Sequence, residues 1–193
     1  SASIAAVAAA FAVSGTVTLL VLRHAARLPA DRPNERSLHA HATPRGGGLA
    51  IWAGFVPAAI ALPAPVGGWP WWLGALFAVG AVSFADDLRG VPVPVRLVAQ
   101  MAAAGIVAAT LLTPVGAPVA YVLAVVVIVW GANLFNFMDG SDGLAGLMAI
   151  TGYGACAVAA ALAGAGALAA ICAAVAAASV PFFLANRPPA SVF

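Results

Sequence analysis

The 193-residue sequence contains no lysine and little charge of either sign. Charged residues make up 7% of the chain and hydrophobic residues 64%, whereas about 25% of a typical soluble domain is charged. This composition excludes a water-soluble domain. The net charge is only +2, which also excludes a nucleic-acid-binding domain, because such domains carry a strongly basic surface.

Cysteine is scarce as well, and the two that are present lie inside apolar segments. We interpret Cys156 and Cys172 as small core residues instead of a disulfide or a metal site. No repeat, linker or second domain is visible, so the sequence predicts a single transmembrane domain over residues 1–193. The chain begins with Ser1 and stops abruptly after the short segment Arg187–Phe193, so we expect it to be part of a longer chain, truncated at the C-terminus.

Long apolar runs make up the rest of the sequence. A helix needs about 20 apolar residues to cross a bilayer, and lipid offers no partner for an unpaired backbone group. No segment alternates with the period of a barrel strand. The sequence therefore predicts an all-α, polytopic membrane helical bundle with seven spans near residues 2–22, 46–63, 69–85, 97–113, 119–137, 144–162 and 165–185.

Charge is confined to alternate breaks between these segments, at 23–45, 86–96, 139–142 and 187. The intervening breaks carry none. Alternate breaks emerge on one side of the membrane, and arginine accumulates on cytoplasmic loops. We therefore expect the charged loops in the cytoplasm and the N-terminus outside. Trp69, Trp71 and Trp72 then lie at the outer interface, where aromatic rings anchor helices.

The first charged loop ends in three successive glycines, Gly46–Gly48. Bare backbone at the start of a helix can approach a phosphate closely. The alternative is a glycine-rich entry turn that packs against a neighbouring helix. His39 and His41 have a spacing that is weak for metal ligation. The arginines of this loop are equally explained by their effect on membrane topology.

The second loop carries adjacent carboxylates, Asp86 and Asp87, at the end of an apolar segment. They repel each other, and loss of water there disfavours their charged forms. A divalent cation, a neighbouring Arg89 or Arg96, or interfacial water can keep them ionised. Mg²⁺ commonly uses one or two carboxylates together with substrate phosphates. An interfacial pair balanced by the two arginines is the alternative, although ionisable groups at membrane depth are usually functional.

The third loop, Asn133–Gly143, combines acids, amides and glycines. Asp139 and Asp142 would share a face if a helix covered both. Alternatively, Ser141 or Asp139 caps the sixth helix, although capping does not explain two Asp, two Asn and two Gly together. Calcium binding by an EF-hand is excluded by the ligand spacing. The fourth loop, Asn186–Ala190, predicts only the end of a helix when taken alone.

In their order and polarity, the four loops resemble the polyprenyl-phosphate N-acetylhexosamine-1-phosphate transferases, integral membrane enzymes of glycosyltransferase 4 type. The matching blocks are Pro33-Asn34-x-Arg36-x-x-His39 with Pro44 and Gly46–Gly48, Asp86-Asp87 with Arg96-Leu97-x-x-Gln100, Asn133-x-x-Asn136-x-x-Asp139-Gly-x-Asp142-Gly-Leu-Ala145, and Asn186-x-x-Pro189-Ala190-x-x-Phe193. The third block is highly specific. Its first half, Asn133–Asp139, and Thr43–Gly48 look closer to the O-antigen-initiating members than to the peptidoglycan-precursor transferase.

The resemblance implies transfer of a sugar 1-phosphate from a UDP-N-acetylhexosamine to undecaprenyl phosphate, with release of UMP. This reaction starts lipid-linked surface polysaccharides at the cytoplasmic face of the bacterial inner membrane. The implied cofactor is Mg²⁺, with Mn²⁺ as a substitute, and a homodimer among membrane lipids is compatible. The peptidoglycan-precursor reaction is one alternative. A transporter is disfavoured, because no acid lies near the middle of a span; an inactive membrane fragment is the third reading.

The resemblance also implies roles for individual residues. Asp86 and Asp87 would be the catalytic and metal-binding pair, one of them a candidate base for the lipid phosphate. The nucleotide-sugar pocket would include Asn136, Asp139, Gly140, Asp142 and Asn186, with Asp142 nearest the uracil. Contacts to phosphate would come from Arg36, His39, Arg45, Arg89 and Arg96. In the family, a third acidic Mg²⁺ ligand and a His-rich loop follow the position of Phe193, so we expect these 193 residues to supply only part of the site.

Overall fold

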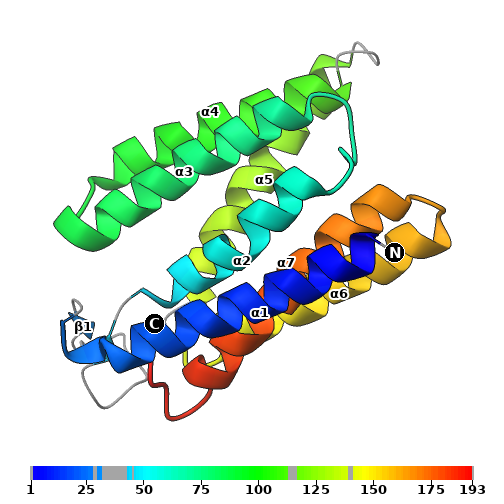
Figure 1. Cartoon of the computed structure of the whole chain (residues 1–193). Helices are drawn as coiled ribbons and strands as arrows, with labels where there is room; N and C mark the ends of the chain where they lie inside the picture. Colours follow the sequence, from blue (N-terminus) through cyan, green and yellow to red (C-terminus); the bar gives the residue numbers. More distant parts are fainter. Residues whose placement is uncertain are drawn as a thin grey trace. The chain divides into compact units, whose positions relative to one another are not determined.

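The structure, a computed structural model, describes residues 2–27, 30–31, 43–44, 46–112, 117–138 and 141–192, with the backbone alone at 27, 30, 31, 87 and 138. Its helices are α1 (Ala2–Arg23), α2 (Gly47–Ala61), α3 (Trp69–Arg89), α4 (Val93–Leu112), α5 (Pro118–Met138), α6 (Leu144–Leu162) and α7 (Gly166–Asn186) (Figure 1). A 3₁₀ turn, Ala25–Arg27, follows α1, and β1 (Ala30–Asp31) pairs antiparallel with β2 (Thr43–Pro44). The predicted all-α fold is confirmed, since each predicted segment is a helix.

Five of the described helices, α1, α4, α5, α6 and α7, are long and apolar enough to cross a membrane. Helix α2 has 15 residues, which is about 22 Å at 1.5 Å per residue and less than the roughly 30 Å hydrocarbon core. Helix α3 has 21 residues and carries Asp86, Asp87 and Arg89 at its end. Membrane crossing by α2 and α3 stays a prediction.

Two helices extend further toward each other than the apolar runs predict. Helix α3 continues through the acidic pair to Arg89 and ends at Gly90, which has a positive φ of 69° and donates its N–H to the carbonyl of Asp86 at 2.9 Å. Helix α4 begins at Val93, four residues before the predicted start. Pro94 is tolerated there because the first turn of a helix needs no N–H donor.

The chain forms two compact units, and the first contains residues 1–65 and 138–193. Within it α7 contacts α1, α2 and α6, and has the largest buried share of the candidate spans. Ala50, Ala174 and Ala178 are fully buried there. Such small side chains let helix backbones approach closely, which is how membrane helices gain packing contacts. The prediction of one domain over residues 1–193 stays a prediction.

A buried serine joins α1 to α7 in this unit. Ser14 is 0% exposed, and its hydroxyl donates to the carbonyl of Ala178 at 2.6 Å. Pro181 lies one turn later and has no N–H for the carbonyl four residues before it, so the hydrogen-bond ladder of α7 is interrupted beside this bond. Side-chain hydrogen bonds between membrane helices contribute about 0.6 kcal/mol each on average.

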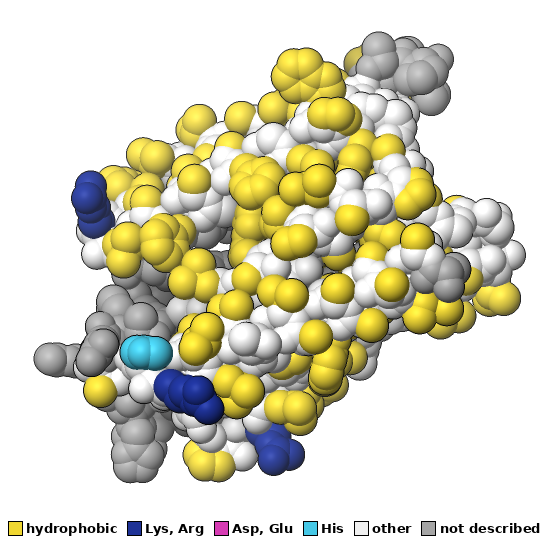
Figure 2. Space-filling view, viewed as in Figure 1, with side chains coloured by type: hydrophobic (Ala, Val, Ile, Leu, Met, Phe, Trp, Pro, Cys, Tyr) yellow, Lys and Arg dark blue, Asp and Glu magenta, His cyan; other side chains and the backbone are white. Residues whose placement is uncertain are grey.

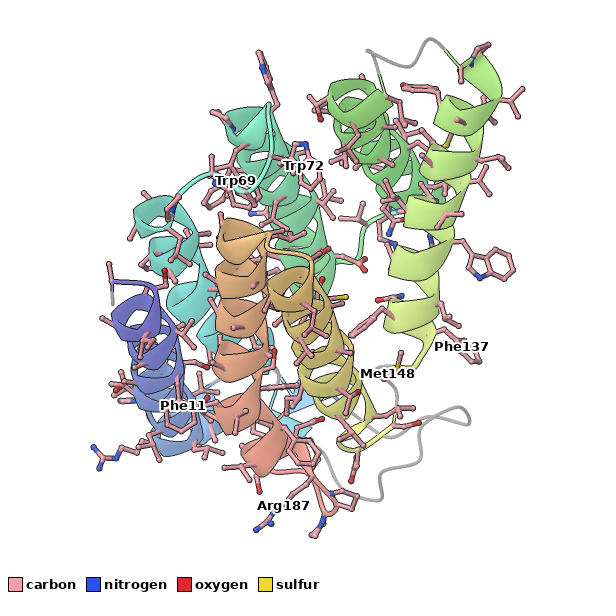
Figure 3. All side chains as sticks on the ribbon, turned by 90° about the vertical axis from the view of Figure 1, so that its right-hand side faces the viewer. Phe11, Trp69, Trp72, Phe137, Met148 and Arg187 are labelled. Atoms are coloured by element: carbon pink, nitrogen blue, oxygen red, sulfur yellow. The ribbon has the colours of Figure 1, made fainter. Side chains whose placement is uncertain are left out.

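The second unit contains residues 66–137, in which α3 packs against α4. At one end the indole N–H of Trp72 donates to the hydroxyl of Thr110 at 2.6 Å, and the Trp69 ring lies 6.2 Å from that of Trp72. Figure 3 shows both rings at this end of α3. Asp86 lies fourteen residues further along the helix, about 21 Å away. Helix α3 therefore separates its aromatic end from its acidic end.

Large apolar side chains are exposed on the spans of both units. None of the apolar window of α5 is buried, and Trp130 and Phe137 are 72% and 82% exposed. Figure 2 shows hydrophobic side chains spread across the visible face and few basic ones. A soluble monomer rarely presents so continuous an apolar surface, and a surface in contact with lipid requires it.

The charge distribution predicts the orientation of the chain. With Cys156 and Cys172 replaced by alanine, a cysteine at position 67 should react with a membrane-impermeant maleimide in intact cells. A side chain at Gly67 would meet no atom within 4 Å, so the substitution is tolerated. A cysteine at His41, which lies outside the described residues, should react only after permeabilisation. Labelling of position 41 in intact cells would reverse the orientation.

The close approach of α2 to α1 predicts that Gly54→Ala destabilises the first unit. A Cβ at Gly54 would overlap the carbonyl oxygen of Ala10 and lie 2.9 Å from the Cβ of Ser14. Overpacking of this kind costs about 1–3 kcal/mol, so the melting temperature in detergent should fall by several degrees. Gly152→Ala on α6 is the control, because its Cβ would meet nothing within 4 Å. Equal melting temperatures would contradict the packing argument.

Candidate functional site

In the second unit, the carboxylate of Asp86 at the end of α3 accepts hydrogen bonds from the α3–α4 connection and from the first turn of α4. One oxygen, Oδ1, accepts the N–H of Val91 at 2.7 Å, and the other, Oδ2, accepts Nη1 of Arg96 at 2.6 Å. The Asp86 and Arg96 side chains are 25% and 31% exposed. The pair is therefore partly desolvated, and its charge-assisted hydrogen bond is of the stronger kind.

The sequence left open whether Arg89 or Arg96 is the partner of the acidic pair, and the structure shows that Arg96 binds Asp86. Arg96, in the first turn of α4, binds Asp86, whereas Arg89 is exposed in the last turn of α3 and makes no ion pair with the described residues. Each oxygen of Asp86 still has a free lone pair. The side chain of Asp87 lies outside the described part of the structure. Metal binding by the two acids stays a prediction.

In the first unit, the start of α6 lies against the end of α7. Gly143 precedes α6 with φ at 76°, a conformation that favours glycine. A Cβ on Gly146 would lie 2.9 Å from the Cβ of Phe183. The two glycines thus let the loop before α6 approach the last turn of α7 and the turn that follows it, residues 187–192, hereafter the post-α7 turn.

Asn186, the last residue of α7, connects these segments. Its Oδ1 accepts the N–H of Gly143 at 2.9 Å, and its Nδ2 donates to the carbonyl of Val192 at 2.8 Å. The side chain is 1% exposed. A buried amide with both ends paired stabilises its surroundings, whereas removal of one partner leaves a costly unpaired group. A direct contact between Asn186 and a nucleotide stays a prediction.

Asp142 contacts the same turn. Its Oδ2 accepts the N–H of Ala190 at 3.0 Å, while its Oδ1 is buried without a hydrogen-bond partner among the described residues. Asp142 lies in a turn before α6, which begins at Leu144, so the condition under which Asp139 and Asp142 would share a helix face is not met at Asp142. The residue at the N-cap of α6 is Gly143 and not Ser141, the alternative considered from the sequence. Asp139 lies outside the described residues.

Arg187 follows α7 and is exposed at the end of the first unit (Figure 3). It lines a pocket of about 400 Å³ with residues of the post-α7 turn, namely Pro188, Pro189 and Ser191, and with Leu184 and Ala185 of α7. Sequence reasoning assigned no role to this arginine or to the backbone of Ala190 and Val192. The one sequence signal for this turn was the block from Asn186 to Ala190. Its contacts are made by main-chain atoms, which are the same in every residue type, so the sequence could not reveal them.

The remaining predicted residues are not brought together by the described structure. Asn136 is exposed near the end of α5. A larger group lies outside the described residues and stays predicted, namely Arg36, His39, Arg45, Asp139 and Gly140. Among the described residues, no three His, Cys, Asp or Glu side chains are close enough to hold a metal.

The helices and their polar ends define a polytopic membrane protein whose chemistry is confined to helix termini. Residues 69–193 match glycosyl transferase family 4, and the chain belongs to this family. It is 35% identical over 150 residues to the decaprenyl-phosphate N-acetylglucosaminephosphotransferase of Mycobacterium tuberculosis, covering 64% of this chain and 37% of the relative. It is 31% identical over 169 residues to the enzyme of the same name from Mycolicibacterium smegmatis, covering 74% and 40%.

These matches confirm the predicted resemblance to polyprenyl-phosphate N-acetylhexosamine-1-phosphate transferases. The match to the curated relatives spans about two fifths of their length. The match over 69–193 includes the acidic end of α3, the loop before α6 and the post-α7 turn. All three polar clusters described above therefore lie within the family segment.

The Asp86–Arg96 pair predicts a stability difference between two arginine variants. Arg96→Gln removes the charged partner of Asp86 and should cost about 1 kcal/mol, lowering the melting temperature of the purified protein in detergent. Arg89→Gln, which removes an exposed arginine seven residues away, should leave the melting temperature nearly unchanged. If the two variants melt alike, the pair does not hold the α3–α4 connection.

Proposed function

We propose that the protein transfers an N-acetylhexosamine 1-phosphate from a UDP-sugar to a polyprenyl phosphate, releasing UMP. The supporting observation is the family segment itself, in which apolar helices carry acidic and basic groups only at their ends. One substrate is a water-soluble nucleotide and the other a membrane lipid, so their phosphates can meet only at a membrane surface. The names of the relatives favour N-acetylglucosamine as the sugar and a polyprenyl phosphate as the acceptor.

The reaction exchanges one phosphoanhydride bond for another. A phosphate oxygen of the lipid bonds to the phosphorus that carries the sugar, and the bond from that phosphorus to the oxygen of UMP breaks. Phosphoryl transfer of this kind depends on alignment and charge neutralisation more than on covalent chemistry. Arginines and carboxylates at helix ends are groups suited to both tasks.

A divalent cation is the proposed cofactor. Asp86 and Asp87 would hold Mg²⁺, because this ion commonly takes one or two carboxylates and completes its shell with water and substrate phosphates. The oxygens of Asp86 each keep a lone pair in the described geometry. When bound, the ion would neutralise charge on the diphosphate. Arg96 fixes the carboxylate of Asp86, and Asp87 is the candidate base for the lipid phosphate.

Asp142 is the proposed nucleotide contact. Its Oδ1 has no hydrogen-bond partner among the described residues, and a carboxylate oxygen can accept the single N–H of a uracil ring. The proposed transfer of the sugar 1-phosphate would start the synthesis of an O-antigen-like polysaccharide at the cytoplasmic face of the bacterial inner membrane. A homodimer is compatible with this proposal.

A transfer assay tests the function directly. Membranes that contain the intact protein would be incubated with Mg²⁺, radiolabelled UDP-N-acetylglucosamine, and undecaprenyl or decaprenyl phosphate. We expect label in the lipid phase and release of UMP. UDP-N-acetylgalactosamine and UDP-N-acetylmuramoyl-pentapeptide serve as competing donors. Transfer from the pentapeptide donor alone would identify a peptidoglycan-precursor enzyme, and no transfer from any donor would reject the proposal.

Replacement of Asp87 should separate catalysis from folding. Asp87→Asn removes a proposed metal ligand and candidate base, so transfer should fall at least 100-fold while the melting temperature stays unchanged. Ser83→Ala, an exposed change one turn earlier on α3, controls for alteration of this helix end. Near-normal turnover of Asp87→Asn in Mg²⁺ would show that the acidic pair is only interfacial.

Replacement of Asp142 should act on nucleotide binding. Asp142→Ala should raise the KM for the UDP-sugar about tenfold, the equivalent of 1.4 kcal/mol, with the KM for the lipid little changed. Asp86→Asn should instead lower turnover at saturating substrate. Equal changes in both KM values, together with a lower melting temperature, would assign Asp142 to structure alone.

A further inference from the structure

The side chain of Asn186 is enclosed at the junction of α6 and α7. It is 1% exposed, and both of its polar atoms bind main-chain groups of the protein. One bond reaches Gly143, which lies 43 residues earlier in the chain, and the other reaches Val192, six residues later. Each polar atom of this side chain thus already has a hydrogen-bond partner in the protein.

The same two segments are joined a second time by Asp142. Its Oδ2 accepts the N–H of Ala190, which joins residue 142 directly to the post-α7 turn. Gly143 is joined to Val192 only through the Asn186 amide, which binds both. A fourth bond, from the N–H of Ser191 to the carbonyl of Ala185, folds the post-α7 turn back onto α7. The turn therefore has a fixed position only while these links hold.

The orientation of Asp142 depends on that position. The Ala190 N–H is the one described donor to its carboxylate, and it fixes Oδ2. The remaining oxygen, Oδ1, is buried without a described partner, a state that costs free energy unless a ligand supplies a donor. Without the amide of Asn186, the turn could move and the carboxylate could rotate.

We propose that Asn186 is a positioning residue that acts through Asp142, holding the post-α7 turn so that Ala190 orients the carboxylate toward a nucleotide donor group. This inference rests on the proposed function, in which Asp142 binds the UDP-sugar. It differs from the direct nucleotide contact that the family resemblance implies for Asn186. The two roles make different predictions for combined substitutions.

Binding measurements on four proteins separate the roles. Asn186→Ala, Asp142→Ala, the double variant and the unaltered intact protein would be compared by equilibrium dialysis with UDP-N-acetylglucosamine, without lipid. If Asn186 acts through Asp142, each single variant weakens binding about tenfold and the double variant is no weaker than Asp142→Ala. A direct contact gives multiplied losses, about 100-fold in the double variant, and would overturn the proposal.

Hydrogen–deuterium exchange supplies a readout that needs no ligand. In Asn186→Ala, peptides that cover residues 141–144 and 187–192 should exchange at least about tenfold faster, the effect of losing one hydrogen bond's worth of local stability. Ser179→Ala is the matched control, because Ser179 is also fully buried on α7 and donates to the carbonyl of Val175, away from the turn. Unchanged exchange in Asn186→Ala would overturn the proposal.

The two measurements also distinguish the inference from the proposed function. If the unaltered protein binds neither UDP-N-acetylglucosamine nor UDP-N-acetylgalactosamine, the nucleotide role of Asp142 fails, and with it the proposed function. The exchange result then still decides whether Asn186 holds the turn and Asp142 together. Faster exchange at both segments with coupled binding losses supports both statements.

Discussion

Hydrocarbon offers no hydrogen-bond partner, and this constraint shapes every part of the chain. Backbone groups must be satisfied within each segment, so the apolar runs become helices. Charged groups are excluded from the spans for the same reason, and they occur at helix ends, as with Asp86 at the end of α3 and Arg187 after α7. The hydrocarbon alone therefore restricts charged groups, and any chemistry that needs them, to the helix termini.

Since lipid is as apolar as the side chains, the helices of the first unit associate through close packing and a few polar contacts. Gly54 lets α2 touch the backbone of α1, and Ser14 bonds α1 to α7 beside Pro181. Close packing also occurs where α6 begins, because Gly143 and Gly146 let this end of α6 lie against the last turn of α7. Close packing thus places the loop of Asp142 within hydrogen-bond distance of Ala190.

The apolar runs located the seven α-helices that the structure describes, because length and composition alone determine where a backbone can be satisfied in lipid. The ends were less predictable. Asp86, Asp87 and Arg89 resemble a loop by composition yet extend α3, and Gly90 was the better signal for its end. Neighbouring charges correctly suggested a partner for Asp86, although sequence left open whether Arg89 or Arg96 supplies it. The bonds of Asn186 were not predictable, because its partners are main-chain groups that every residue type shares.

The bonds of the post-α7 turn to backbone atoms have a consequence for variation at these positions. What Asp142 requires of position 190 is an N–H, and what Asn186 requires of position 192 is a carbonyl oxygen. Nearly every amino acid supplies both, so the side chains there can diverge while the contacts persist. Only proline at 190 would abolish the donor. Two relatives could share this arrangement and show no common residue in the turn.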